Sequence, residues 1–153
     1  MARVRGPNLL EALILLLAAL AVAAALLPEY RSWQRADYRL RAAVALTALA
    51  EALHARHART GTYAGAALAD GAPADTGPPA LRPASVPAEG AARYRLRIET
   101  ANARGFEIHA IPVADQQADP CGTLTLTAAG IRGIEAAAPE TRIAACWSGV
   151  DGA

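Results

Sequence analysis

The sequence predicts an α+β fold in which a long N-terminal helix packs on a small antiparallel β-sheet. Two observations carry this prediction. Residues 8–59 contain no glycine, and they are dominated by alanine and leucine, which are both strong helix formers. Residues 93–135 instead show apolar and polar side chains in alternation, the period of two that half-buried strands have.

Composition limits the size and the class of the protein. The chain has 153 residues, a formal net charge of +1 and 5% aromatic residues. This length is typical of one domain, and so few aromatic side chains allow only a modest core. The near-neutral charge gives no bulk attraction to nucleic acid. The composition therefore excludes a large multidomain enzyme.

The first half of the predicted helix has the character of a membrane segment. Residues 12–27 carry no charged or hydrogen-bonding side chain, and Asn8 and Glu11 are the only interruptions back to Pro7. A helix of about 21 such residues is long enough to cross a hydrocarbon core of about 30 Å. Two arginines, Arg3 and Arg5, precede it. We therefore expect a targeting or membrane-spanning segment over residues 7–28.

The second half of the helix, residues 29–60, is predicted to be amphipathic. Four apolar side chains recur there at helical spacing on one face: Ala42, Leu46, Leu49 and Leu53. The charged side chains lie away from that face. Pro28 should kink the helix because its ring clashes with the preceding turn, and Gly61 should end it.

Residues 61–92 are predicted to form a Pro/Gly-rich connecting loop, in which 71–92 lack regular structure. The stretch 71–92 holds five of the ten prolines of the chain and three glycines. Such a composition favours an extended surface loop.

Residues 93–153 are predicted to form the sheet. Strands are expected over 93–99, 105–113, 123–127 and 131–135. In the first hairpin we expect Ile98 to pair with Phe106, which sets Arg97 opposite Glu107 in a favourable pair. A shift by one pair would oppose two glutamates, so this register is preferred.

The order of several short motifs resembles that of type IV pilins. Gly6, followed five residues later by Glu11 and an apolar run, resembles the class III leader junction of type IV prepilins. Pro28 with Tyr30 close behind, and the Gly-Thr-Tyr motif at 61–63, are similar to features of the pilin helix. The Asp-Pro-Cys-Gly-Thr-Leu-Thr-Leu stretch at 119–126, with Cys-Trp at 146–147, resembles the end of minor pilins of the PilE type.

This resemblance implies a fold, a processing site and partners. It implies the type IV pilin fold, with residues 1–6 as the leader and prepilin peptidase cleavage between Gly6 and Pro7. Pilins usually have phenylalanine, with a methylated amine, where this chain has Pro7. It further implies that Glu11 pairs with the N-terminal ammonium of a neighbouring subunit during assembly, and that the helix unwinds locally at Pro28.

The resemblance also implies the location and the partners of the chain. The expected partners are other pilin subunits, the prepilin peptidase and the assembly platform of the inner membrane. The chain would cross the bacterial inner membrane once, with a cytoplasmic N-terminus and a periplasmic C-terminal domain, and would then enter the pilus. Twitching, adhesion or DNA uptake are the expected roles.

The only two cysteines are Cys121 and Cys146. An even pair in a translocated domain favours a disulfide, and two free thiols or half of a metal site are the alternatives. The pilin resemblance implies a C-terminal disulfide loop. Neither cysteine has a neighbouring cysteine or histidine at metal-binding spacing.

The remaining polar residues are given structural rather than chemical roles. His54 and His57 are expected on a solvated helix face, and His109 is expected to face solvent beside Arg95. The outward row of Arg93, Arg95 and Arg97 is a candidate contact for DNA phosphates, but a solvated or subunit-facing strand is preferred. No catalytic site, cofactor or metal is expected.

Three other classes stay open at this point. A pseudopilin of a type II secretion system shares the leader and the long helix. A secreted periplasmic binding domain would follow from signal-peptide cleavage at the small residues 21–25, which would remove Glu11. The third is a single-pass membrane anchor that is never processed.

Overall fold

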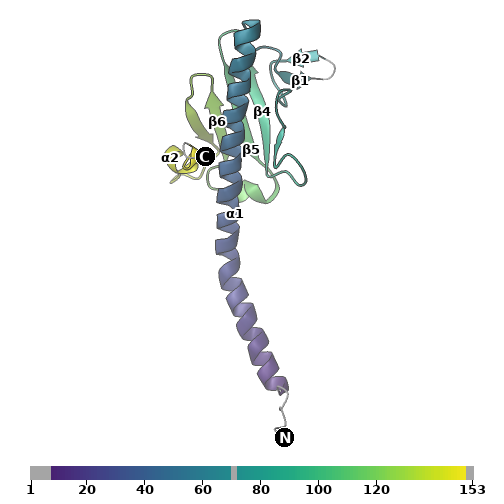
Figure 1. The fold of residues 1–153 in the computed structure, drawn as a ribbon. Helices are drawn as coiled ribbons and strands as arrows, with labels where there is room; N and C mark the ends of the chain where they lie inside the picture. The colour runs from purple at the N-terminus through teal and green to yellow at the C-terminus, as the bar shows by residue number, and fades with distance from the viewer. Residues whose placement is uncertain (1–7, 70–71, 151–153) are drawn as a thin grey trace. The chain divides into compact units, whose positions relative to one another are not determined.

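The computed structural model describes residues 8–69 and 72–150, which form two compact units, residues up to 34 and residues from 35 onward. Helix α1, Leu9–Thr60, contributes to both units. The described residues of the first unit are helical from Leu9 onward. The second holds the rest of α1 and all the strands (Figure 1).

Five strands form one antiparallel sheet in the order β3-β4-β5-β6-β7. They are β3 (Ser85–Val86), β4 (Tyr94–Ala101), β5 (Phe106–Pro112), β6 (Thr123–Thr127) and β7 (Arg132–Glu135). A short 3-10 helix, η1 (Ala114–Ala118), links β5 to β6, and α2 (Ile143–Cys146) follows β7. The predicted helix-on-sheet architecture is therefore confirmed.

The core lies between one stripe of α1 and the inner face of the sheet. The predicted stripe is buried, because Ala42, Leu46, Leu49 and Leu53 have no exposed surface. The side chains of the sheet that join them in one cluster include Tyr94, Leu96, Ile98, Ile108, Leu124 and Leu126. Burying one such leucine stabilises the fold by about 1.5–3 kcal/mol, so the stripe fixes this half of α1 on the sheet.

The predicted hairpin register is wrong by two residues. Ile98 pairs with Ile108, and Arg97 lies opposite His109 instead of Glu107. The turn causes the difference, because it pairs Ala101 with Phe106, three residues out of the predicted register. A β-bulge between Ile98 and Thr100 then brings the pairing back by one residue and takes Glu99 out of the ladder. Glu99 then pairs with Arg97 on its own strand. The two glutamates therefore never oppose each other, and their repulsion does not select the register.

The prediction that residues 71–92 lack regular structure is wrong in two short segments, and a third strand lies just before them in the same loop. β1 (Ala67–Ala69) pairs with β2 (Ala72–Ala74) in a separate two-stranded sheet, and β3 extends the main sheet. Proline lacks an N–H, but its carbonyl still accepts hydrogen bonds, as Pro78 does from the amide of Leu68. Residues beside the prolines supply donors, for example Gly77 to the carbonyl of Ile98 and Ala80 to that of Ala66.

Two predictions concern the course of α1, one at Pro28 and one at its C-terminal end. The helix continues through Pro28, so the proline does not end it, and the kink stays a prediction. The predicted stop at Gly61 is confirmed. Gly61 has a φ of 75° and its amide donates to the carbonyl of His57, which is the left-handed cap that glycine adopts most readily.

Candidate functional site

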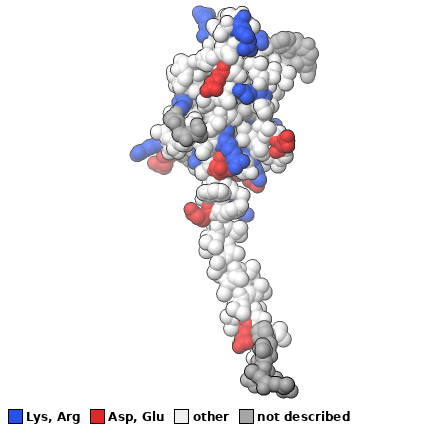
Figure 2. Space-filling model, viewed as in Figure 1, with Lys and Arg blue, Asp and Glu red and all other residues white. Residues whose placement is uncertain are grey.

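The first candidate site is the apolar part of α1. Helix α1 contains a segment with a mean hydropathy of 2.7 that is long and apolar enough to cross a membrane. Its large side chains are exposed around the helix, for example Leu13, Ile14 and Leu17. Figure 2 shows this part as uncharged surface apart from one acidic patch near the start of the helix. Such a surface needs lipid or other helices to cover it.

Glu11 lies in the first turn of this apolar helix. Its Oε2 accepts a hydrogen bond from the backbone N–H of Asn8 at 3.0 Å. Asn8 precedes the first helical residue, so the carboxylate closes the helix start as the glutamate of a capping box does. It also interacts favourably with the positive end of the helix dipole. Gly6 and Pro7, the predicted cleavage site, lie outside the described residues.

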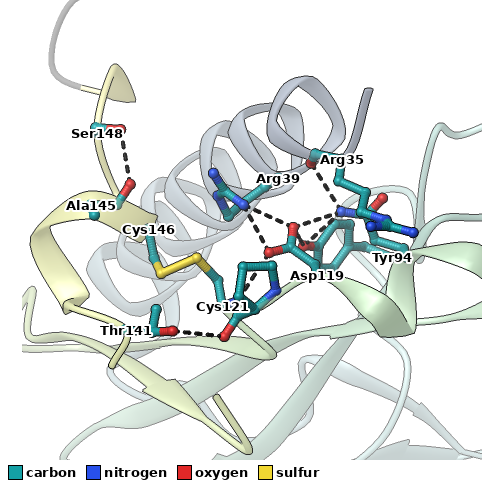
Figure 3. A network of polar contacts seen from close by, with 11 residues as sticks. Arg35, Arg39, Tyr94, Asp119, Cys121, Thr141, Ala145, Cys146 and Ser148 are labelled. Atoms are coloured by element: carbon teal, nitrogen blue, oxygen red, sulfur yellow. Dashed lines mark hydrogen bonds and ion pairs between the residues drawn. A yellow bond between two sulfur atoms is a disulfide. The ribbon is translucent and has the colours of Figure 1, made fainter. Parts of the chain in front are cut away.

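The second candidate site is the C-terminal loop, which a disulfide between Cys121 and Cys146 closes. Two residues before Cys121, the carboxylate of Asp119 is fully buried. Arg39 of α1 donates from Nη1 to both carboxylate oxygens, at 2.8 and 3.0 Å (Figure 3). The loop that carries the disulfide is therefore tied directly to the helix.

Three further donors complete the coordination of Asp119. The Tyr94 hydroxyl and the Gln116 side-chain amide donate to Oδ2, and the Cys121 backbone N–H donates to Oδ1. Burial raises the pKa of Tyr94 far above its ordinary value, and the neighbouring Asp119 carboxylate adds to this. The network holds no exposed reactive group, so it is structural and not catalytic.

The role of Asp119 is not apparent from the sequence alone. A carboxylate directly before Pro120 and Cys121 was recognised there only as part of the pilin resemblance. The signal available in the sequence was an aspartate before Cys121 and several arginines on the predicted helix that could pair with it. Which arginine reaches it depends on the tertiary packing of α1, which no local pattern gives.

The third candidate site is the outer face of the sheet, where the arginine row was expected. Arg93, which precedes β4, pairs with Asp115 and lies over the ring of Tyr38 of α1 at 5.5 Å, so its side chain turns toward the helix. Arg97 pairs with Glu99, which leaves Arg95 exposed and without a described ion pair. Two of the three arginines are therefore neutralised, which disfavours this row as a phosphate-binding stripe.

His109 corrects a prediction on the same face. It was expected to face solvent, but it is 7% exposed. Its Nε2 is 3.1 Å from Glu107 Oε1, and its Nδ1 is 4.0 Å from Glu135 Oε2. His109 lies on the central strand β5, between Arg97 of β4 and Thr125 of β6.

The fourth candidate site is the end of the sheet unit where α1 stops. Tyr63 follows the helix, and its amide donates to the carbonyl of Asn102 in the β4–β5 turn. This bond brings the helix end and the turn together. Each of the two bonded segments carries an exposed arginine without a described ion pair. Arg59 lies near Tyr63, and Arg104 lies near Asn102. Figure 2 shows basic side chains gathered at this end.

The helix histidines belong to the same end, and their expected solvation is only partly correct. His57 stacks on the ring of Tyr63, with 4.3 Å between centroids. His54 Nδ1 is 3.1 Å from the Tyr63 hydroxyl, and its ring contacts Phe106 edge-on. We call the surface formed by Arg59, Arg104 and His57 the basic end.

The chain combines a long helix, whose first part exposes apolar side chains and whose second part packs on an antiparallel sheet, with a disulfide-closed loop. This is the architecture of a type IV pilin subunit. A family model described as type IV minor pilin ComP, DNA uptake sequence receptor, matches residues 28–125. The chain belongs to this family. It is therefore a minor pilin, a non-enzymatic pilus subunit involved in DNA uptake, found first in the membrane and then in the pilus.

The chain is also similar to one solved type IV pilin. The structure of a type IV pilin from Shewanella oneidensis is 26% identical over 71% of this chain and 96% of that chain, with a TM-score of 0.47. No curated protein matches this sequence.

Proposed function

We propose that this minor pilin binds duplex DNA directly through the basic end. The observation that carries the proposal is the pair of exposed arginines, Arg59 and Arg104, on two segments joined by the Tyr63–Asn102 hydrogen bond. Neither arginine has an ion pair among the described residues. Arginine binds phosphate oxygens through up to five N–H donors in a fixed plane. Membership in a family of DNA uptake receptors supports the same partner.

The positions of the other arginines favour this end over the outer row. On the outer face, Glu99 and Asp115 already hold Arg97 and Arg93. A phosphate would have to displace those carboxylates before it could bind. At the basic end no described carboxylate pairs with Arg59 or Arg104. The aromatic packing of His57 on Tyr63 holds the helix end rigid, so less conformational entropy is lost on binding.

Replacing Arg59 and Arg104 by glutamine should weaken DNA binding. Each lost phosphate contact lowers the slope of log affinity against log salt by about 0.9. The measurement is fluorescence anisotropy of a labelled duplex with the full chain in detergent micelles, over a range of salt concentrations. The matched control is Arg142→Gln, because Arg142 is also exposed but lies before α2. Equal binding by the double variant and the wild type would refute this assignment, as would an equal loss in the control.

We also propose that the chain is cut between Gly6 and Pro7 by a prepilin peptidase and assembles through Glu11, with its N-terminus cytoplasmic beforehand. Within the single chain, the Glu11 carboxylate accepts the N–H of Asn8. Cleavage would create an ammonium at Pro7, one residue away. A neighbour's ammonium offers the carboxylate a full positive charge in place of a neutral amide, which is a stronger partner in an apolar bundle.

Glu11→Ala should block entry into the filament without unfolding the sheet unit. Glu11 has no described contact beyond Asn8, so Trp147 and the disulfide loop should be unaffected. The measurement is the ratio of this chain in sheared pili to that in membranes, by immunoblot. Glu29→Ala is the control, because Glu29 is another exposed carboxylate of α1. Normal incorporation of Glu11→Ala would disprove the role of this carboxylate.

A further inference from the structure

The outer face of the sheet carries a cluster that neither the assembly helix nor the basic end uses. Glu107 and His109 lie on β5, and Glu135 lies on β7, one strand beyond β6. Each residue offers one ligand atom, and the three atoms lie within 4.8 Å of one another. We propose that this cluster binds one divalent transition-metal ion of the Zn²⁺ type.

The chemistry of the three groups suits such an ion. Imidazole nitrogen and carboxylate oxygen are both ordinary zinc ligands, at about 2.0–2.2 Å from the metal. Ligand atoms at tetrahedral angles around such an ion are about 3.4 Å apart. The 3.1 Å between His109 Nε2 and Glu107 Oε1 is already close to that spacing. Glu135 Oε2 lies 4.0 Å from the other ring nitrogen, Nδ1, and one ion binds only one nitrogen of the ring. The Glu135 side chain is 58% exposed, so we expect it to rotate toward Nε2 to complete the set.

The surrounding strands hold the histidine in place for this role. Thr125 of β6 lies opposite His109, and Gly133 of β7 lies opposite Thr125. A Cβ atom at Gly133 would be 2.5 Å from Thr125 Oγ1, so a larger residue there would require Thr125 to move. The position on β7 in the same cross-strand row as His109 therefore has no side chain, and Glu135 reaches the imidazole past it.

The charges of the face also favour a cation. Arg97, the basic residue opposite His109, is engaged by Glu99. The only described partner of the Glu107 and Glu135 carboxylates is the His109 ring. A divalent ion would satisfy both carboxylates at once, and three protein ligands would leave its fourth position to water. Because the ion would join β5 to β7, its binding should also stabilise the sheet.

The test is a zinc titration of the untagged full chain in detergent, with a competing chromogenic chelator to count bound ions. We expect one Zn²⁺ per chain and a rise in the midpoint of thermal unfolding. Glu135→Gln should lower the affinity at least ten-fold, and His109→Asn should abolish binding. Because the Glu135 side chain is largely exposed, we expect Glu135→Gln to fold as the wild type does. Its unfolding midpoint without zinc should equal that of the wild type.

The control is the double variant His54→Asn, His57→Asn, which removes the other two histidines of the chain. We expect it to bind zinc as the wild type does. Unchanged affinity in Glu135→Gln, or loss of binding only in the helix double variant, would overturn the proposal. The DNA-binding proposal does not depend on this result, because the basic end shares no residue with the cluster.

Discussion

Asp119→Ala is expected to destabilise the sheet unit by about 3–5 kcal/mol, because it removes one partner of a buried ion pair. The Arg39 side chain is only 18% exposed and would be left without its carboxylate. Tyr94 and Gln116 would each lose an acceptor as well. The measurement is urea unfolding of the full chain in micelles, followed by the fluorescence of Trp147, which is 3% exposed.

The matched control for this prediction is Asp115→Ala. Asp115 also pairs with an arginine, Arg93, but its side chain is 89% exposed. An exposed pair of this kind contributes about 0–1 kcal/mol. If the two variants cost the same, burial is not what makes the Asp119 network important.

Removing the disulfide is expected to cost about 3.5 kcal/mol on the chain-entropy model. The bond joins Cys121 to Cys146 across a sequence separation of 25. The double variant Cys121→Ser, Cys146→Ser should therefore unfold at a lower temperature, and reduced wild-type protein should match it. A loss below about 1 kcal/mol would contradict the prediction that this crosslink stabilises the fold.

These two effects should not add. The Cys121 amide donates to Asp119, so the carboxylate and the crosslink hold the same loop. Neighbouring groups that share a partner show interaction free energies of about 0.5–3 kcal/mol. The combined variant should therefore lose less stability than the sum of the two separate losses.

The helix and the main strands could be predicted from the sequence because their signals are local. The stripe from Ala42 to Leu53 and the alternation around Leu96 depend only on the spacing of apolar residues. The hairpin register could not be predicted, because no alternation reveals that the turn pairs Ala101 with Phe106 or that a bulge at Glu99 follows. Strands β1, β2 and β3 were missed because they are only two or three residues long, too short to show an alternating pattern.

The candidate site residues also differ in whether a local sequence pattern reveals them. Glu11 stands out locally, because it is the one charged residue in a long apolar stretch. Asp119 and His109 do not, because their importance depends on burial beside groups from other elements. The arginine row of β4 looked basic along the sequence, yet Asp115 and Glu99 neutralise most of it in the fold.

The most direct test of the central claim, that this chain is a processed pilus subunit, is the N-terminal peptide mass of the protein in sheared filaments. We predict that the chain is present there and begins at Pro7, with or without a methyl group. A chain found in the soluble periplasmic fraction and beginning at Ala24 or Leu26 would contradict the claim, as would an unprocessed chain found only in membranes.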